Sequence, residues 1–232
     1  TPEATSQNFM VTGYKRLVDV AADRARVEQV RTPNFAYFQG PAPQKQVVGV
    51  DGSVGYNVAA NGNAARIPNA AAKDRRAEIY HHPITIVRAA LDPAAKLANP
   101  RTESNQSIVD LTTANGLTFT LAIDSTTKLP TRVVSMVDHP NLGDVANETS
   151  FGDYQAVGEL QLPARLATKT DKYATGEIRV TRQSVDGDVG DLAAPAAAAS
   201  AAPIEGPPAA NVTVEEVDKG IWFLAGQGAH SV

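Results

Sequence analysis

Four histidines are the residues of this chain best suited to acid–base or metal chemistry: His81, His82, His139 and His230. No two of them have the i, i+2 or i, i+4 spacing that brings two imidazoles to one metal ion. Adjacent helical side chains point about 100° apart, so His81 and His82 share an ion only if the backbone turns between them. Beside Pro83, helix capping or surface exposure is the better explanation. We therefore predict no catalytic residue and no metal ligand in this segment.

Other patterns exclude further classes of site. The sequence has no cysteine, which excludes disulfides, thiolate metal sites and cysteine nucleophiles. The stretch "DGDVGD", from Asp186 to Asp191, has glycine at its fifth and aspartate at its sixth position, the reverse of an EF-hand loop. No Gly-x-Ser-x-Gly motif supports a serine hydrolase. Enzymatic chemistry is therefore not visible in these residues.

One apolar stripe could contact a ligand. Ile84, Val87 and Leu91 fall at i, i+3 and i+7, which places them on one face of a helix. Such a stripe usually packs into a core, and lining of a ligand cavity is the second interpretation. These three residues are the only candidate binding residues that the sequence offers.

Two consecutive helices are predicted in this region, and the second one carries the stripe. Alanine, arginine and glutamate favour a helix from Ala71 to Tyr80. Pro83 suits the first position of a second helix, because the N–H that proline lacks has no partner there. Asp92 precedes Pro93 and should end this helix, since a residue before proline is disfavoured in the α region.

The remaining residues before position 187 favour strands. Residues 8–32 alternate loosely around "AAD", as in a hairpin, and a second hairpin should turn at Asp51-Gly52. Six further strands, joined by short turns, are predicted at residues 107–113, 116–124, 130–138, 148–157, 160–170 and 176–185. A long meander needs cover on its apolar face. We therefore expect an α+β fold in which a curved antiparallel sheet wraps over the helical block.

An Ala/Pro-rich segment, residues 187–211, divides the chain. Large apolar residues are nearly absent from it, and proline favours extended conformations, so it is predicted to be a semi-rigid linker. A long surface loop within one domain is the alternative. The expected organisation is a sheet domain at 1–186, the linker at 187–211 and the start of another domain at 212–232.

Part of the first domain resembles outer-membrane lipoprotein carrier-like domains. The resemblance rests on Asp124 followed by "TTKLPTRV" (Thr126 to Val133), on "FGDY" (Phe151 to Tyr154) and on "LQLPARL" (Leu160 to Leu166). It covers about half of the domain. It implies a half-barrel whose concave face holds an acyl chain or another apolar group.

The closing stretch "VTVEEVDKGIWFLAGQGAHSV", Val212 to Val232, is similar to the opening strands of the metallo-β-lactamase superfamily fold. The resemblance implies an incomplete αββα domain whose zinc site, built around a His-x-His-x-Asp-His cluster, lies in a downstream part of the polypeptide. No cofactor is expected in the present residues. The apolar run Ile221 to Leu224 is then expected to be covered by that missing part.

These observations leave three functional hypotheses. The leading one is the N-terminal accessory region of an exported zinc-dependent hydrolase, which orients substrate or forms a homodimer and has the catalytic domain of its own polypeptide as partner. The second is a stand-alone module that binds lipid or another apolar small molecule. The third is a scaffold that helps a larger partner to fold or dimerise.

Charge and hydropathy narrow the partners. A net charge of −4 with scattered basic residues excludes a nucleic-acid footprint. The sequence contains no run of about 18 apolar residues, so no membrane span is predicted. The first residues lack an initiator Met, as in a mature exported protein or a trimmed polypeptide, and the family resemblance implies a periplasmic or secreted location.

Overall fold

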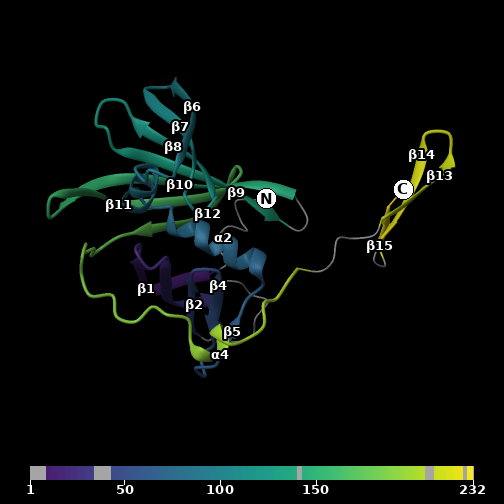
Figure 1. The fold of residues 1–232 in the computed structure, drawn as a ribbon, viewed down its shortest axis with the longest axis horizontal. Coiled ribbons are helices and arrows are strands. Elements are labelled where there is room, and N and C mark those ends of the chain that lie inside the picture. The colour runs from purple at the N-terminus through teal and green to yellow at the C-terminus, as the bar shows by residue number, and fades with distance from the viewer. Residues whose placement is uncertain (1–8, 34–42, 140–142, 207–211, 227–228, 232) are drawn as a thin grey trace.

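Antiparallel sheet makes up most of the molecule, as Figure 1 shows for the computed structural model. The structure describes residues 9–33, 43–139, 143–206, 212–226 and 229–231. These residues form open sheets of five, seven and three strands. The prediction of a mainly antiparallel protein is confirmed. The region before the linker, however, forms two separate open sheets, whereas one curved sheet was expected.

The first sheet has the order β1-β2-β3-β4-β5. Its strands are β1 (Phe9–Asp19), β2 (Arg24–Pro33), β3 (Gln44–Asp51), β4 (Val54–Val58) and β5 (Ala64–Arg66). Both predicted hairpins are present, and Gly52 has the positive φ of +54° that the tight turn after Asp51 requires. Gly49 is needed for another reason, since a Cβ there would collide with the ring of Tyr56.

The second sheet is a meander in which every strand pairs with its neighbours along the chain. Its strands are β6 (Lys96–Glu103), β7 (Gln106–Thr112), β8 (Thr118–Asp124), β9 (Pro130–His139), β10 (Gly143–Val157), β11 (Leu160–Thr170) and β12 (Tyr173–Arg179). The six predicted strands are β7 to β12. No predicted strand covers β6, which is an exposed edge strand. It contains Pro100, and its pairing with β7 shifts register between Ala98 and Arg101.

Two helices connect the sheets: α2 (Asn69–Ile79) and α3 (Pro83–Ala90). The start of α3 at Pro83 was predicted. Its Ile86 is completely buried and packs into the largest apolar core of the described residues. The sheet side of that core consists of Leu111, Leu117, Phe119, Leu121, Val133, Phe151 and Leu166. The helices therefore supply cover for the inner face of the seven-stranded sheet.

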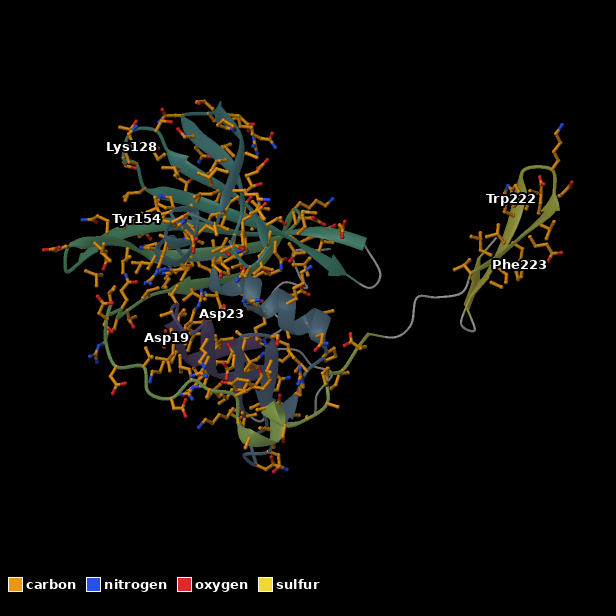
Figure 2. The ribbon with its side chains drawn as sticks, viewed as in Figure 1. Asp19, Asp23, Lys128, Tyr154, Trp222 and Phe223 are labelled. Atoms are coloured by element: carbon orange, nitrogen blue, oxygen red, sulfur yellow. The ribbon has the colours of Figure 1, made fainter. Side chains whose placement is uncertain are left out.

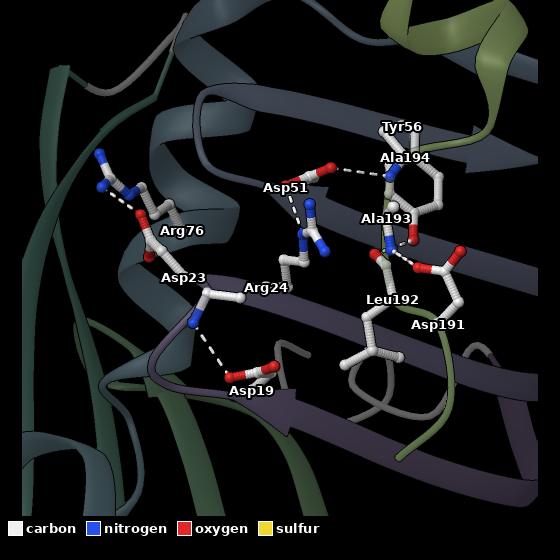
Figure 3. Close-up of polar contacts among 11 residues, drawn as sticks. Asp19, Asp23, Arg24, Asp51, Tyr56, Arg76, Asp191, Leu192, Ala193 and Ala194 are labelled. Carbon is white, nitrogen blue, oxygen red and sulfur yellow. Dashed lines mark hydrogen bonds and ion pairs between the residues drawn. The ribbon is translucent and has the colours of Figure 1, made fainter.

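Polar contacts attach α2 to the five-stranded sheet. The Arg75 guanidinium donates to the backbone oxygens of Gly49, at 3.2 Å, and Tyr56, at 2.6 Å. Arg76 forms an ion pair with Asp23 in the β1–β2 turn (Figure 3). Because α2 continues into α3, these contacts fix the corner between the helices relative to both sheets.

Residues 191–205, which we call the strap, lie against the five-stranded sheet. Within the strap, the helical turn α4 (Ala196–Ala199) contacts β4 and β5. Leu192 and Ala198 are buried. The Ala194 N–H donates to Asp51, whose other oxygen accepts from Arg24 (Figure 3). Burial raises the pKa of Asp51, but these two donors outweigh it and lower the pKa overall.

Backbone oxygens make most of the other strap contacts. Side-chain donors of the sheet reach Asp191 O from Arg26, Leu192 O from Tyr56 and Ala201 O from Arg66. Residues 191–205 are therefore docked against the five-stranded sheet, although their composition predicted a semi-rigid linker. Composition was misleading because it counts side chains, whereas this segment binds mainly through its main chain. Residues 207–211 of the predicted linker lie outside the described residues.

The third sheet is formed by β13 (Thr213–Asp218), β14 (Ile221–Gly226) and β15 (Ala229–Ser231). Gly220, with φ of +77°, makes the turn between β13 and β14. Figure 2 shows Trp222 and Phe223 on β14. Across the described ranges, no helix has both the length and the apolar character needed to cross a bilayer.

Candidate functional site

A cavity of about 290 Å³ lies between the two large sheets and the end of α2. Side chains of both sheets line it, so it exists only when the sheets are held in their observed arrangement. Its apolar walls are Ala25, Val27, Val48, Ile79, Val137, Leu166 and Ile178. Three buried polar residues, His81, Ser135 and Thr149, form part of its lining.

His81 connects two strands of the seven-stranded sheet. Its Nε2 lies 2.9 Å from Ser135 Oγ on β9, and its Nδ1 lies 2.8 Å from Thr149 Oγ1 on β10. The ring also contacts Phe119 edge-on, with centroids 6.1 Å apart. Both ring nitrogens therefore have hydrogen-bond partners although the side chain is only 7% exposed.

The local sequence directs His81 toward the sheet. Pro83 begins α3, which leaves His82 as an extended N-cap residue whose Nδ1 accepts from the Ile84 N–H at 3.4 Å. Thr85 Oγ1 donates to Ile79 O at 2.6 Å and closes the corner. The two histidines consequently have different roles, since one caps a helix and the other enters the core.

Burial sets the protonation of both histidines. It lowers the pKa of His81 to about 4, and the positive charge of Arg16 acts in the same direction. The pKa of His82 is lowered to about 4 by the same two causes. At neutral pH each imidazole is therefore uncharged, with one N–H donor and one bare nitrogen acceptor.

Charged residues lie around the cavity, and most of their groups already have partners. Arg16 Nη2 donates to Glu78 O at 2.6 Å and to Ile79 O at 3.2 Å, which satisfies carbonyls at the end of α2. Lys169 pairs with Glu148 at 3.2 Å. Burial raises the pKa of the Glu78 carboxyl against the opposing effect of Arg16 and Arg75. The lining thus contains both signs of charge.

The residues proposed from sequence as cavity lining lie elsewhere. Val87 packs against the main core, and Leu91 is 77% exposed at the end of α3. Neither residue lines the cavity between the sheets, and nor does Ile84. The helical stripe therefore gives no support to an apolar ligand at this cavity.

Sequence reasoning missed Ser135 and Thr149. Ser135 lies on the same face of β9 as Val133 and Val137, so its hydroxyl is placed between apolar side chains. Thr149 shares a face of β10 with the buried Phe151 in the same way. A polar residue at an inward position of a strand was the available signal, because buried hydroxyls require partners.

A second unusual feature is that β14 carries large apolar side chains on both faces. Strand alternation places Trp222 and Leu224 on one face and Ile221 and Phe223 on the other. Val214 of β13 lies opposite Leu224 and extends the first face. Trp222 is 48% exposed, Ile221 46% and Leu224 39%.

Comparisons with known proteins do not assign the chain to a family. No family model, no curated protein and no solved structure matches it. Within the residues that the structure describes, no group of three His, Asp or Glu side chains could hold a metal ion. The side chains of His139 and His230 lie outside that description. The cavity and the β13–β15 sheet are therefore the two features from which a function can be proposed.

Proposed function

We propose that this chain is the N-terminal accessory region of a zinc-dependent hydrolase of the metallo-β-lactamase type, with β13–β15 as the opening strands of its αββα domain. The catalytic zinc would be held by residues downstream of these strands. The two large sheets, with their helices, would form a non-catalytic body that holds or orients substrate. An exported, periplasmic or secreted location is part of this proposal.

The apolar character of both faces of β14 carries the proposal. A strand at a water-exposed sheet face alternates polar and apolar residues, whereas Ile221 to Leu224 are apolar without interruption. A strand of this kind is stable when layers cover it from both sides, as in the interior of an αββα sandwich. Burying one large apolar side chain contributes about 1.5–3 kcal/mol. Cover on both faces of β14 would therefore be a substantial stabilisation.

The carrier-like resemblance is consistent with the accessory role. The seven-stranded meander is an open sheet with α3 packed on one face. We propose that this sheet serves as the half-barrel of the accessory domain. Its function would be to position another molecule or a second subunit, since the described residues show no metal-binding group.

The test uses the natural polypeptide that contains this chain. Hydroxyl-radical footprinting with mass spectrometry should show Trp222 protected, whereas Tyr173, which is similarly exposed at 49% on β12, serves as the matched control and should react. Elemental analysis should find zinc that stays bound through purification. Hydrolysis of ester and lactam substrates should be lost with chelation.

Two results would contradict the proposal. One is a natural polypeptide with the 24.4 kDa mass of this chain alone. The other is a longer polypeptide in which Trp222 reacts as rapidly as Tyr173 and no zinc is retained.

A further inference from the structure

We propose that the cavity between the two sheets binds a small uncharged organic molecule whose apolar body carries a carbonyl or hydroxyl oxygen, held by a hydroxyl of Ser135 or Thr149. This inference is independent of the proposed hydrolase function. It concerns a site formed entirely by residues of this chain that the structure describes.

The hydrogen bonds of the His81 ring are the first reason for this proposal. A neutral imidazole donates one proton and accepts one. One of its two hydroxyl partners must therefore accept from the ring N–H, while the other donates to the bare nitrogen. The accepting hydroxyl keeps its own proton. Neither Ser135 nor Thr149 has another hydrogen-bond partner among the described residues, so this proton is available to an oxygen in the cavity.

Burial makes that unused proton significant. Ser135 is 6% exposed and Thr149 is 4% exposed, and both line the cavity. A buried donor without an acceptor costs about 1–3 kcal/mol, so this proton must be accepted by water or by a ligand. A ligand oxygen at this position can replace water without losing that hydrogen bond, which gives the cavity a specific polar anchor.

The walls and the volume define the rest of the ligand. Valine, leucine and isoleucine side chains form one part of the lining, against which the apolar body of a ligand would pack, and polar and charged side chains form the rest. A volume of about 290 Å³ accommodates on the order of ten non-hydrogen atoms, judged from the ~30 Å³ that one water occupies in the liquid. An acyl chain of more than about ten carbons would exceed this volume.

Charge selects an uncharged ligand. Positive and negative side chains are equal in number in the lining: Arg16, Arg75 and Lys169 against Asp74, Glu78 and Glu148. The imidazole of His81 is itself neutral at pH 7 because burial lowers its pKa. An anion would therefore lose hydration without a net electrostatic attraction from the lining.

Nuclear magnetic resonance titration of the whole chain tests the proposal with three probes: cyclohexanone, methylcyclohexane and cyclohexanecarboxylate. Saturable ¹⁵N–¹H shifts with cyclohexanone should map to the cavity lining, including Val137, Thr168 and Ile178. After each affinity is divided by the probe's water-to-hydrocarbon partition coefficient, we expect cyclohexanone to bind at least about fivefold more tightly than methylcyclohexane, because only the ketone accepts a hydrogen bond. The carboxylate should bind more weakly than the ketone.

Variants identify the donor. Ser135→Ala or Thr149→Val should weaken cyclohexanone binding about fivefold, whereas Ser107→Ala, on β7 and outside the cavity lining, should leave the affinity unchanged. If a cavity variant does not fold, the comparison of ketone and hydrocarbon on the unmodified chain still decides. Equal partition-corrected affinities for those two probes, shifts that map away from the cavity, or no shifts at all would overturn the proposal.

Discussion

The inner face of the seven-stranded sheet and the strand β14 both contain large apolar side chains, but they differ in cover. Leu121 and Val133 lie on strands β8 and β9 and are buried together with Ile86 of α3. On β14, Trp222 and Leu224 remain substantially exposed. The apolar content of a strand therefore does not determine its burial. An element that packs on it does, and the helices provide that element for the two large sheets but not, among the described residues, for β14.

The comparison also separates two kinds of sequence pattern. In β8, the buried residues Phe119 and Leu121 alternate with Thr118 and Thr120 on the opposite face, as expected for a strand with one covered side. In β14, four consecutive apolar residues allow no such division. The second pattern requires cover on two sides, which is the reason for assigning β13–β15 to another domain in the proposed function.

Ile86→Ala should give the largest effect and would break the comparison if it did not. Removing a fully buried isoleucine leaves a cavity between α3 and the sheet, so the free energy of unfolding should fall by about 2–5 kcal/mol. Urea unfolding followed by circular dichroism measures this change. Leu91→Ala, at the exposed end of the same helix, is the control and should shift stability by no more than about 0.5 kcal/mol. Similar losses for both variants would show that α3 does not cover the core.

Acid should lower the free energy of unfolding of the two large sheets and their helices by a smaller amount. The folded pKa of His81 is about 4 and that of an unfolded histidine is about 6.5, so the unfolded chain binds more protons between these values. Stability contributed by the neutral ring is present above pH 6.5 and is lost as pH falls toward 4. The expected loss from His81 is about 2 kcal/mol by pH 5, and His82 adds to it in the same direction.

Urea unfolding between pH 7 and pH 4 measures this loss. His81→Gln removes one titrating group and should flatten the dependence while lowering stability at pH 7. A stability that stays level from pH 7 to pH 5 in the unmodified chain would show that His81 is not buried as a neutral ring.

Trp222→Ala should have the smallest effect and would sharpen the comparison. In this chain Trp222 is half exposed, so the change should alter the unfolding of the two large sheets by less than about 0.5 kcal/mol. In the natural polypeptide of the proposed hydrolase, the same change should cost about 3–5 kcal/mol because the ring is then buried. Thermal and urea unfolding of both proteins gives the two values. Equal effects in both contexts would remove the argument for cover.

Local chemistry explains which elements could be predicted. The Asp51-Gly52 turn, the start of α3 at Pro83 and the alternation of β7 to β12 all depend on neighbours in the sequence. The division into two sheets could not be predicted, because it depends on which strands pair after the helices intervene. β6 was missed because its exposed residues and Pro100 carry no apolar pattern.

The buried polar residues of the cavity could not be grouped from the sequence. Ser135 is 54 residues from His81 and Thr149 is 68 residues away, so only the fold brings the three together. The sequence suggested capping or surface exposure for both His81 and His82. Only His82 caps a helix. His81 is inward because the corner closed by Thr85 turns it toward the sheet.

The strap has a consequence for how this chain can diverge. Its contacts use main-chain atoms at Asp191, Leu192, Ala194 and Ala201, so most replacements of its side chains leave these bonds in place. Adding or deleting a residue between the anchors would move every later anchor out of reach of its donor. Homologous chains should therefore vary at the exposed positions of this segment while keeping its length and the buried Leu192 and Ala198, and alignment scores based on residue identity do not register the constraint on length.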